Sequence, residues 1–235
     1  MTGLVTTVKG KIPRKIRRQS KLLAARAFES VGADLFSHPA LNDLDRKILP
    51  YLGSDPGLFL EIGANDGYSQ SNTYYLERRL GWKGILIEPV PGLYQRCQRL
   101  RQASKCFNLA CVGAEGPDAV DLMDLDLMSV ALGQQSQDEE FLRLSGHAGV
   151  AIRVEATTLS DVIDRAEAVH VDFMSIDVEG AELQVIAGLD LGRHTPSWLL
   201  VETAHSSEVT SLLSGHMQFE AQLSHHDYLF RSLGL

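Results

Sequence analysis

The stretch that decides the fold is Leu58-Phe-Leu-Glu-Ile-Gly-Ala-Asn-Asp-Gly67, an apolar run that passes into a turn bounded by two glycines. Gly63 and Gly67 allow a tight turn and a close approach of a ligand to the backbone. The spacing Glu-x-Gly-x-x-x-Gly differs from the dinucleotide fingerprint Gly-x-Gly-x-x-Gly, because Asn65 stands where a bare backbone would meet a pyrophosphate. The turn therefore disfavours a nicotinamide dinucleotide.

Two carboxylates flank this turn and indicate what it binds. Glu61 ends the apolar run and Asp66 lies inside the turn, so together they would repel a diphosphate and attract an ammonium group. A cofactor that combines a ribose, an adenine and an amino-acid end is S-adenosylmethionine, which we expect here. The alternative is a glycine-rich turn between a strand and a helix that binds no ligand.

Outward from this turn, short apolar runs alternate with helical stretches. The runs predict strands at residues 58–62, 84–87, 107–112, 171–176 and 198–201, and the intervening patterns predict helices at 74–80, 94–102, 181–189 and 209–213. Residues 216–223 and 225–233 predict a terminal hairpin. Nearly continuous apolar strands that alternate with helices indicate an α/β fold, with a mostly parallel sheet covered by helices on both faces.

Residues outside this alternation divide the chain. Residues 1–55 read as a basic arm followed by helices, the second of them at 41–52, and residues 56–235 read as the catalytic domain. Residues 113–158 are acidic and loop-like, with strands expected only at 119–125 and 150–156, and form a candidate insertion on the substrate side.

Acidic residues end the second and a later predicted strand. Glu88 ends the second strand at about the distance after the glycine turn, roughly 20 residues, at which an acid binds ribose hydroxyls in such folds. Asp177 ends the strand at 171–176, and Glu179 follows it. Two carboxylates at this edge could position a hydroxyl, take its proton or bind a divalent metal, whereas Glu179 could also simply cap the next helix.

The predicted strand at 198–201 brings further candidates. Glu202 ends the strand at 198–201, and His205 follows three residues later. If the two strands are neighbours, Asp177, Glu202 and His205 converge, and with Mg²⁺ they would form an oxygen-rich metal site. Without a metal, His205, or His147 from the insertion, would be the base.

Composition and charge restrict the class of partner. The 235 residues are 44% hydrophobic and 22% charged, as in a globular domain, and no apolar run is long enough to span a bilayer. Residues 1–26 contain eight basic residues and no acid, so the remainder, with 14 basic and 30 acidic residues, has a net charge of −16. Such a negative charge on residues 27–235 disfavours binding of nucleic acid and favours a small-molecule or oligosaccharide acceptor.

The basic arm and the cysteines complete the expectations about location. The arm is expected to be a helix that packs on the body or, alternatively, contacts a membrane surface, and not to be needed for cofactor binding. Three cysteines without a Cys-x-x-Cys spacing are too few for a disulfide framework. We expect reduced thiols in a cytoplasmic protein, which we also expect to be a homodimer.

In combination and order, four segments resemble the FkbM family of S-adenosylmethionine-dependent methyltransferases. They are Glu61-Ile-Gly-Ala-Asn-Asp-Gly67, Ser71-Asn-Thr73, Gly81-Trp-Lys-Gly-Ile-Leu-Ile-Glu-Pro89 and Ile176-Asp-Val-Glu-Gly-Ala-Glu182. The resemblance implies a Rossmann-like class I methyltransferase fold, with seven strands of which the last is antiparallel. It also implies O-methylation of sugars, oligosaccharides or glycosylated natural products.

The same resemblance assigns roles by position. Glu61, Gly63, Asn65 and Gly67, with Asp66 and Ser71 nearby, would line the methionine end of the cofactor. Glu88 would bind the ribose, Asn108 would approach the adenine, and Asp177 would face the transferring methyl group. Two other classes stay open: a non-catalytic cofactor-binding or scaffold protein on this fold, and a nucleotide-dependent oxidoreductase.

Overall fold

The computed structural model describes residues 14–124, 129–131 and 150–234, and divides into two compact units. The first unit, Met1–Ser37, contains helix α1 (Arg14–Ser30). The second unit, His38–Leu235, contains all the other elements. The unit boundary therefore precedes the predicted helix at 41–52, which belongs to the second unit.

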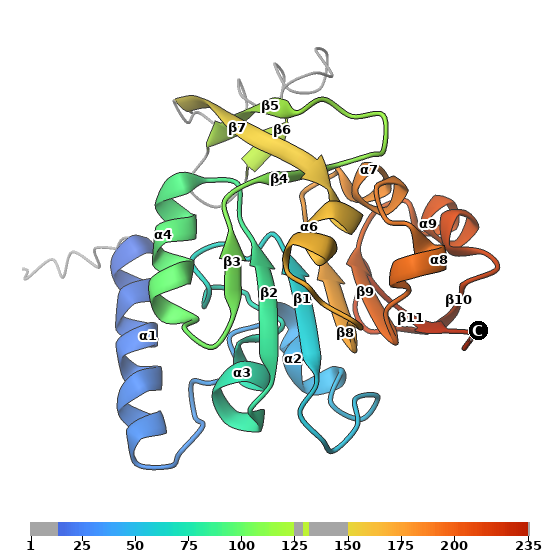
Figure 1. Ribbon diagram of the computed structural model, residues 1–235. Coiled ribbons are helices and arrows are strands. Elements are labelled where there is room, and N and C mark those ends of the chain that lie inside the picture. Colours follow the sequence, from blue (N-terminus) through green and yellow to red (C-terminus); the bar gives the residue numbers. More distant parts are fainter. Residues whose placement is uncertain (1–13, 125–128, 132–149, 235) are drawn as a thin grey trace, which may run out of the picture. The chain divides into compact units, whose positions relative to one another are not determined.

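A seven-stranded sheet forms the centre of the second unit (Figure 1). Its order is β10-β11-β9-β8-β1-β2-β3, and β11 alone runs in the direction opposite to the other six strands. This topology confirms the predicted Rossmann-like methyltransferase fold. The strands are β1 (Leu58–Ile62), β2 (Lys83–Ile87), β3 (Lys105–Phe107), β8 (Phe173–Ile176), β9 (Trp198–Glu202), β10 (Met217–Gln222) and β11 (Asp227–Ser232).

Helices cover both faces of this sheet. One face packs against α6 (Leu159–Arg165), α7 (Glu182–Ala187) and α9 (Ser206–Leu213). The other packs against the end of α2 (Leu44–Lys47), α3 (Tyr74–Leu80) and α4 (Pro91–Leu100). Two short helices, η1 (Leu41–Asp43) and α8 (Leu191–His194), complete the set in the described residues.

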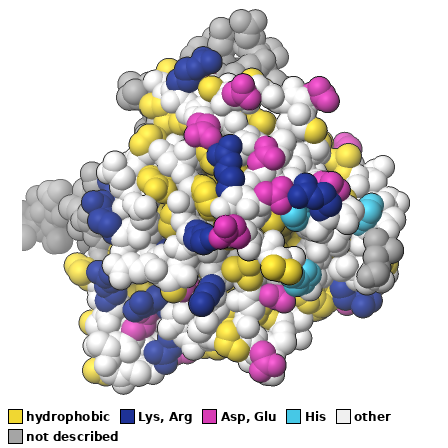
Figure 2. Space-filling model, viewed as in Figure 1, with side chains coloured by type: hydrophobic (Ala, Val, Ile, Leu, Met, Phe, Trp, Pro, Cys, Tyr) yellow, Lys and Arg dark blue, Asp and Glu magenta, His cyan; other side chains and the backbone are white. Residues whose placement is uncertain are grey.

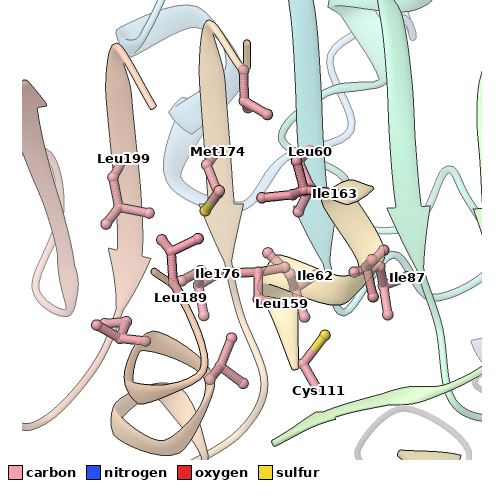
Figure 3. Packing of buried hydrophobic residues seen from close by; sticks show 14 of the residues in the cluster. Leu60, Ile62, Ile87, Cys111, Leu159, Ile163, Met174, Ile176, Leu189 and Leu199 are labelled. Carbon is pink, nitrogen blue, oxygen red and sulfur yellow. The ribbon is translucent and has the colours of Figure 1, made fainter. Parts of the chain in front are cut away.

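Side-chain alternation along each strand produces two cores. On β1, Leu60 and Ile62 point to the first face, whereas Phe59 and Glu61 point to the second. Figure 3 shows the first core, where Ile62, Met174 and Ile176 of the sheet meet Leu159 and Ile163 of α6. Each such fully buried side chain stabilises the fold by about 1.5–3 kcal/mol.

A second, four-stranded sheet departs from the expected pattern. It consists of β4 (Ala110–Val112), β5 (Ala119–Asp124), β6 (Ser129–Ala131) and β7 (Val150–Thr158) in the order β4-β7-β5-β6. The prediction of one strand at 107–112 is wrong, because the chain leaves the main sheet after Phe107 and enters the second sheet at Ala110. The second sheet therefore starts at the carboxyl end of β3 and lies across that end of the main sheet (Figure 1).

Two smaller observations complete the fold. The predicted helix at 41–52 is shorter, because Asn42 and Asp43 adopt left-handed backbone conformations and the α-helical part ends at Lys47. All three cysteines are free, and the sulfurs of Cys97 and Cys106 lie 4.0 Å apart. Among the described residues, no helix combines the length and the apolar character that a membrane crossing requires.

Candidate active site

Five carboxylates lie on one face of the main sheet, at the edge where the parallel strands end. Each lies two residues, or for Asp177 four residues, from a strand member of the second core, so strand alternation directs it to the face that carries α3 and α4. We call this set the acidic row; in sheet order it consists of Glu88, Glu61, Asp177, Glu202 and Asp227. Open α/β sheets bind ligands at this edge, and the strand order reverses beside β1.

Glu61 is neutralised within the protein. Its carboxylate accepts hydrogen bonds from the Ser71 hydroxyl at 2.9 Å, the Thr73 hydroxyl at 2.7 Å and the Asn72 backbone N–H at 2.8 Å. The guanidinium of Arg101 lies 3.8 Å away. Glu61 and Ser71, both predicted to bind cofactor, are thus buried parts of an internal network.

Arg101 is the centre of that network, although its side chain is completely buried. It donates to Glu77 at 2.9 Å, to the carbonyl of Gly67 at 3.0 Å and to the hydroxyl of Thr73 at 2.9 Å. A buried charge is tolerated when it is paired and hydrogen-bonded, and both conditions hold here. Arg101 therefore fixes the end of the glycine turn from inside the protein.

The backbone N–H groups of the glycine turn are all used by the chain itself. Those of Gly63 and Ala64 both donate to the Ile87 carbonyl at 3.0 Å, and that of Gly67 donates to Ala64. That of Asn65 donates to Glu88, and that of Asp66 donates to the Asn65 side chain. No N–H in residues 63–67 is directed toward a phosphate, so the turn does not form an anion-binding nest.

The geometry of the turn explains why it contains Gly63 and what Asp66 does in it. Gly63 has φ +87°, and a Cβ there would lie 1.8 Å from the Asp177 carbonyl oxygen, so only glycine fits between β1 and β8. Asp66 accepts hydrogen bonds from the N–H groups of Tyr68 and Ser69. The carboxylate of Asp66, predicted to attract the cofactor, thus holds the segment that follows the turn.

Glu88 joins the turn to the end of β2. Its two carboxylate oxygens accept from the backbone N–H groups of Asn65 and Val90, each at 2.8 Å. An acid at the end of the second strand is the group that binds ribose hydroxyls in folds of this kind. The Asn108 side chain donates to the carbonyls of Glu88 and Pro89 at 2.9 and 2.8 Å, which holds Asn108 beside the same strand end.

At the other end of the acidic row, three carboxylates lie together with no arginine among them. The register places Asp177 beside Glu202 at the ends of the neighbouring parallel strands β8 and β9. Asp227 lies directly opposite Glu202 on the antiparallel strand β11. Ser224 donates to one oxygen of Asp227, while the buried second oxygen, Oδ1, has no hydrogen-bond partner.

Burial and mutual repulsion determine the protonation of this group. Desolvation, and then the charge of Glu202, raise the pKa of Asp177 well above its ordinary value. Desolvation and the charge of Asp227 raise the pKa of Glu202, and burial raises that of Asp227. These three carboxyl groups therefore bind protons more readily than ordinary carboxyl groups do.

Three predicted catalytic residues remain, Glu179, His205 and His147. Glu179 follows Asp177 on the loop after β8, with a left-handed backbone, and its charge helps to raise the pKa values of Asp177 and Glu202. Desolvation of its own carboxyl group, with the charge of Glu182, raises the pKa of Glu179 as well. The His205 ring lies 3.5 Å from Glu208 on its own helix and is more than half exposed. His147 lies outside the described residues.

The predicted metal site does not assemble. Its three proposed ligands were Asp177, Glu202 and His205, but the ring of His205 is paired with Glu208 rather than with the two acids. No group of three or more His, Cys, Asp or Glu side chains in the described residues is arranged to hold a metal ion. The donor set therefore does not fit Mg²⁺, and no step below uses it.

Sequence reasoning missed two residues of this region, Asp227 and Arg101. Asp227 had a signal: it begins the second strand of the predicted hairpin, and the amino end of an antiparallel strand lies at the carboxyl edge of its parallel neighbour. Arg101 had none, because nothing in the sequence distinguishes it from Arg99, which is exposed two residues earlier.

The acidic row contrasts with the protein surface seen in Figure 2. On the face that carries α6, basic and acidic side chains are interspersed, so the excess negative charge is not gathered into one patch there. Exposed pairs on the surface, such as Arg193 with Asp164 at 2.8 Å, contribute little to stability. The row instead concentrates carboxylates where water is partly excluded, which strengthens their effect on a bound cation.

Comparisons with known proteins identify the family of the chain. The family model described as "Methyltransferase FkbM domain" matches residues 61–231. No curated protein matches the chain. Solved structures similar to it include a human methyltransferase 10 domain containing protein (9% identity, 95% of this chain and 98% of that chain covered, TM-score 0.46). Others are a SAM-dependent methyltransferase from Aquifex aeolicus (12%, 95% and 98%, 0.44) and a TehB-like SAM-dependent methyltransferase from Corynebacterium glutamicum (9%, 93% and 100%, 0.42).

The matched segment contains the glycine turn, all five residues of the acidic row and the reversed strand order beside β1. It covers most of the second unit. The predicted family resemblance is thereby confirmed: the chain belongs to the FkbM family of S-adenosylmethionine-dependent methyltransferases.

Proposed function

We propose that this protein transfers a methyl group from S-adenosylmethionine to a hydroxyl of a neutral sugar, oligosaccharide or glycosylated natural product. The observation that supports it most is that Asp177 and Glu202 lie side by side at neighbouring strand ends with raised pKa values, one strand away from the glycine turn. Such a pair can accept the proton that a hydroxyl must lose when it is methylated.

The glycine turn and Glu88 suit this cofactor better than a dinucleotide. Because the N–H groups of residues 63–67 are already satisfied, a pyrophosphate would find no donors there, whereas S-adenosylmethionine carries no phosphate. Glu88 ends β2 where an acid binds the ribose in such folds, and Asn108 is held beside it. This arrangement disfavours the alternative of a nucleotide-dependent oxidoreductase.

The pair Asp177–Glu202 is suited to the role of base. When bound, S-adenosylmethionine supplies an electrophilic methyl group on a positively charged sulfur. An ionised carboxyl group of the pair accepts the proton of the acceptor hydroxyl as the oxygen attacks. Raised pKa values make carboxylates better bases near neutral pH than ordinary ones.

The charge of the row also indicates the acceptor. Carboxylates accept hydrogen bonds from hydroxyl groups, and Asp177 and Glu202 offer two carboxyl groups side by side. A phosphorylated or sulfated acceptor would be repelled by this end of the row, where no arginine neutralises the acids. A neutral polyol satisfies these groups without adding charge.

The experiment is methyl transfer from isotope-labelled S-adenosylmethionine to a panel of acceptors. We expect an O-methyl ether on neutral glycosides and no product on their phosphorylated or sulfated counterparts, with products identified by mass spectrometry and NMR. Calorimetric titration should detect binding of S-adenosylmethionine and none of NAD. Transfer only to amines or RNA would contradict the acceptor assignment, and binding without any transfer would favour a non-catalytic protein.

A further inference from the structure

We infer that helix α1 and the residues that follow it bind the surface of a membrane rich in anionic lipids. The 17 residues of α1 contain six basic residues and a single acid, Glu29. The second unit, by contrast, is strongly acidic and would be repelled by such a surface. The first unit is therefore the part of the chain with the charge to bind it.

The charge of α1 is placed against its own helix dipole. Four of its basic residues, Arg14, Lys15, Arg17 and Arg18, lie in its first five positions, and no basic residue lies in its last turn. Cations at a helix amino terminus are destabilising, because the backbone dipole is positive there. A local arrangement that opposes stability is explained when an anionic partner neutralises it.

Apolar side chains are exposed in the same unit. Leu23 is 66% exposed, Val31 77% and Leu35 64%. Ala27, one turn after Leu23 on the same side of the helix, is exposed as well. Of the ten large hydrophobic side chains exposed in the described residues, four lie between residues 23 and 35. Exposed apolar groups next to basic ones are typical of helices that lie in a membrane interface.

This exposure belongs to an ordered segment. The helix ends in a Schellman motif, in which Gly32 has φ +83°, its N–H donates to the Glu29 carbonyl and that of Ala33 donates to Phe28. The Phe28 and Phe36 rings then pack 5.5 Å apart. The folded chain thus presents Val31 just past the helix end and Leu35 four residues later.

The chemistry of the partner follows from these two features together. A nucleic acid would match the charges but not the exposed leucines and valine. Since α1 is too polar to cross a bilayer, it would lie parallel to the surface, with the basic residues at the phosphate level. An anionic lipid surface matches both the charge and the apolar side chains.

The test is co-sedimentation of the full chain with vesicles of phosphatidylcholine containing about one third phosphatidylserine, against pure phosphatidylcholine. We expect binding to the anionic vesicles that is lost in 0.5 M salt, since salt screens exposed charges. The variant Arg14→Gln/Arg17→Gln/Arg18→Gln should bind about 100-fold more weakly, because each basic residue near such a surface contributes roughly a fivefold factor. Leu23→Ser/Val31→Ser/Leu35→Ser should bind at least about tenfold more weakly.

Matched controls use exposed residues of the second unit. Lys83→Gln/Arg96→Gln/Arg99→Gln makes the same change in charge, and Leu80→Ser/Val169→Ser/Leu212→Ser removes comparable apolar groups. Both controls should bind vesicles like the wild type, and all variants should retain their circular dichroism. Equal binding to neutral vesicles, or equal losses in the controls, would overturn the inference. The inference would also be overturned if the chain did not bind vesicles but formed a dimer in sedimentation velocity, and Leu23→Ser disrupted that dimer. This result would assign the surface to a second copy of the chain.

Discussion

The two ends of the acidic row have the same residue chemistry and opposite environments. Glu61 is surrounded by donors, among them two hydroxyls, a backbone N–H and the nearby cation of Arg101. Asp177, Glu202 and Asp227 face one another, and Asp227 keeps an unpartnered buried oxygen. If all these acids served only the stability of the fold, we would expect hydrogen-bond donors or cations around both ends of the row. From this difference we propose that Glu61 belongs to the framework and the other three to the reaction.

The largest expected effect tests the reactive end. Asp177→Asn should lower turnover about 10²–10⁴-fold, because the amide cannot hold the proton that passes from the acceptor. Turnover is measured with saturating cofactor, and cofactor affinity is measured alongside. Asp55→Asn, in an exposed loop, is the matched control and should leave turnover unchanged. Undiminished turnover in Asp177→Asn would refute the assignment of the base.

The next effect contrasts one substitution at both ends of the row. Glu61→Gln should reduce the free energy of unfolding by about 2–4 kcal/mol, because it leaves Arg101 buried with only one carboxylate partner. Glu202→Gln should leave the free energy of unfolding unchanged or raise it, since it relieves repulsion from Asp227. Denaturant unfolding at pH 7 measures both, and equal destabilisation would remove the distinction between the two ends.

A third prediction concerns the cofactor. Glu88→Gln should weaken S-adenosylmethionine binding about 10- to 100-fold, because it removes a charged acceptor of about 1.5–3 kcal/mol and places an amide group against a backbone N–H. Titration calorimetry measures the affinity. Glu115→Gln, which is exposed, serves as the reference. An unchanged affinity would show that the ribose lies elsewhere.

The pH dependence of stability should separate the two ends further. Folding raises the pKa values of Asp177, Glu202 and Asp227, so the folded state binds protons more tightly than the unfolded state. Their contribution to stability is therefore fully present below the ordinary pKa of about 4 and is lost as the pH rises through the raised values. From pH 4 to pH 7, the free energy of unfolding of the wild type should fall relative to that of the variant Asp177→Asn/Glu202→Gln/Asp227→Asn. A flat difference would contradict the raised pKa values.

The smallest expected effect is no change at all. Because no His, Cys, Asp or Glu side chains in the described residues are arranged to hold a metal ion, methyl transfer should keep its rate in EDTA. Addition of Mg²⁺ afterwards should not increase it. A loss in EDTA that Mg²⁺ restores would mean that the acids bind a cation after all.

Prediction from sequence was accurate where periodicity decides the structure and less complete where contacts between distant residues do. The strand containing Leu60 and Ile62 was predicted with its observed bounds, because a fully apolar run before a glycine turn has few other solutions. The strand at 107–112 was not, because the apolar pattern continues while the pairing partner changes from β2 to β7. The local sequence pattern does not show with which strand a segment pairs.

The same limit applies to the candidate site. Strand ends identified Glu88, Asp177 and Glu202, because the carboxyl edge of a parallel sheet gathers them. Whether each acid is neutralised could not be predicted, since Arg101 reaches Glu61 from 40 positions away in the sequence. His205 was placed in the site by its sequence spacing alone, yet the turn before α9 directs it to Glu208.

The two-residue link between the sheets has a consequence for insertions and deletions. Asn108 is tied to the end of β2 and Leu109 is buried in the first core, so the link has no slack. One added residue would move every β4 side chain to the opposite face of its sheet. Homologues should therefore vary in length in exposed connections such as residues 53–56, and keep the distance between Phe107 and Ala110 constant.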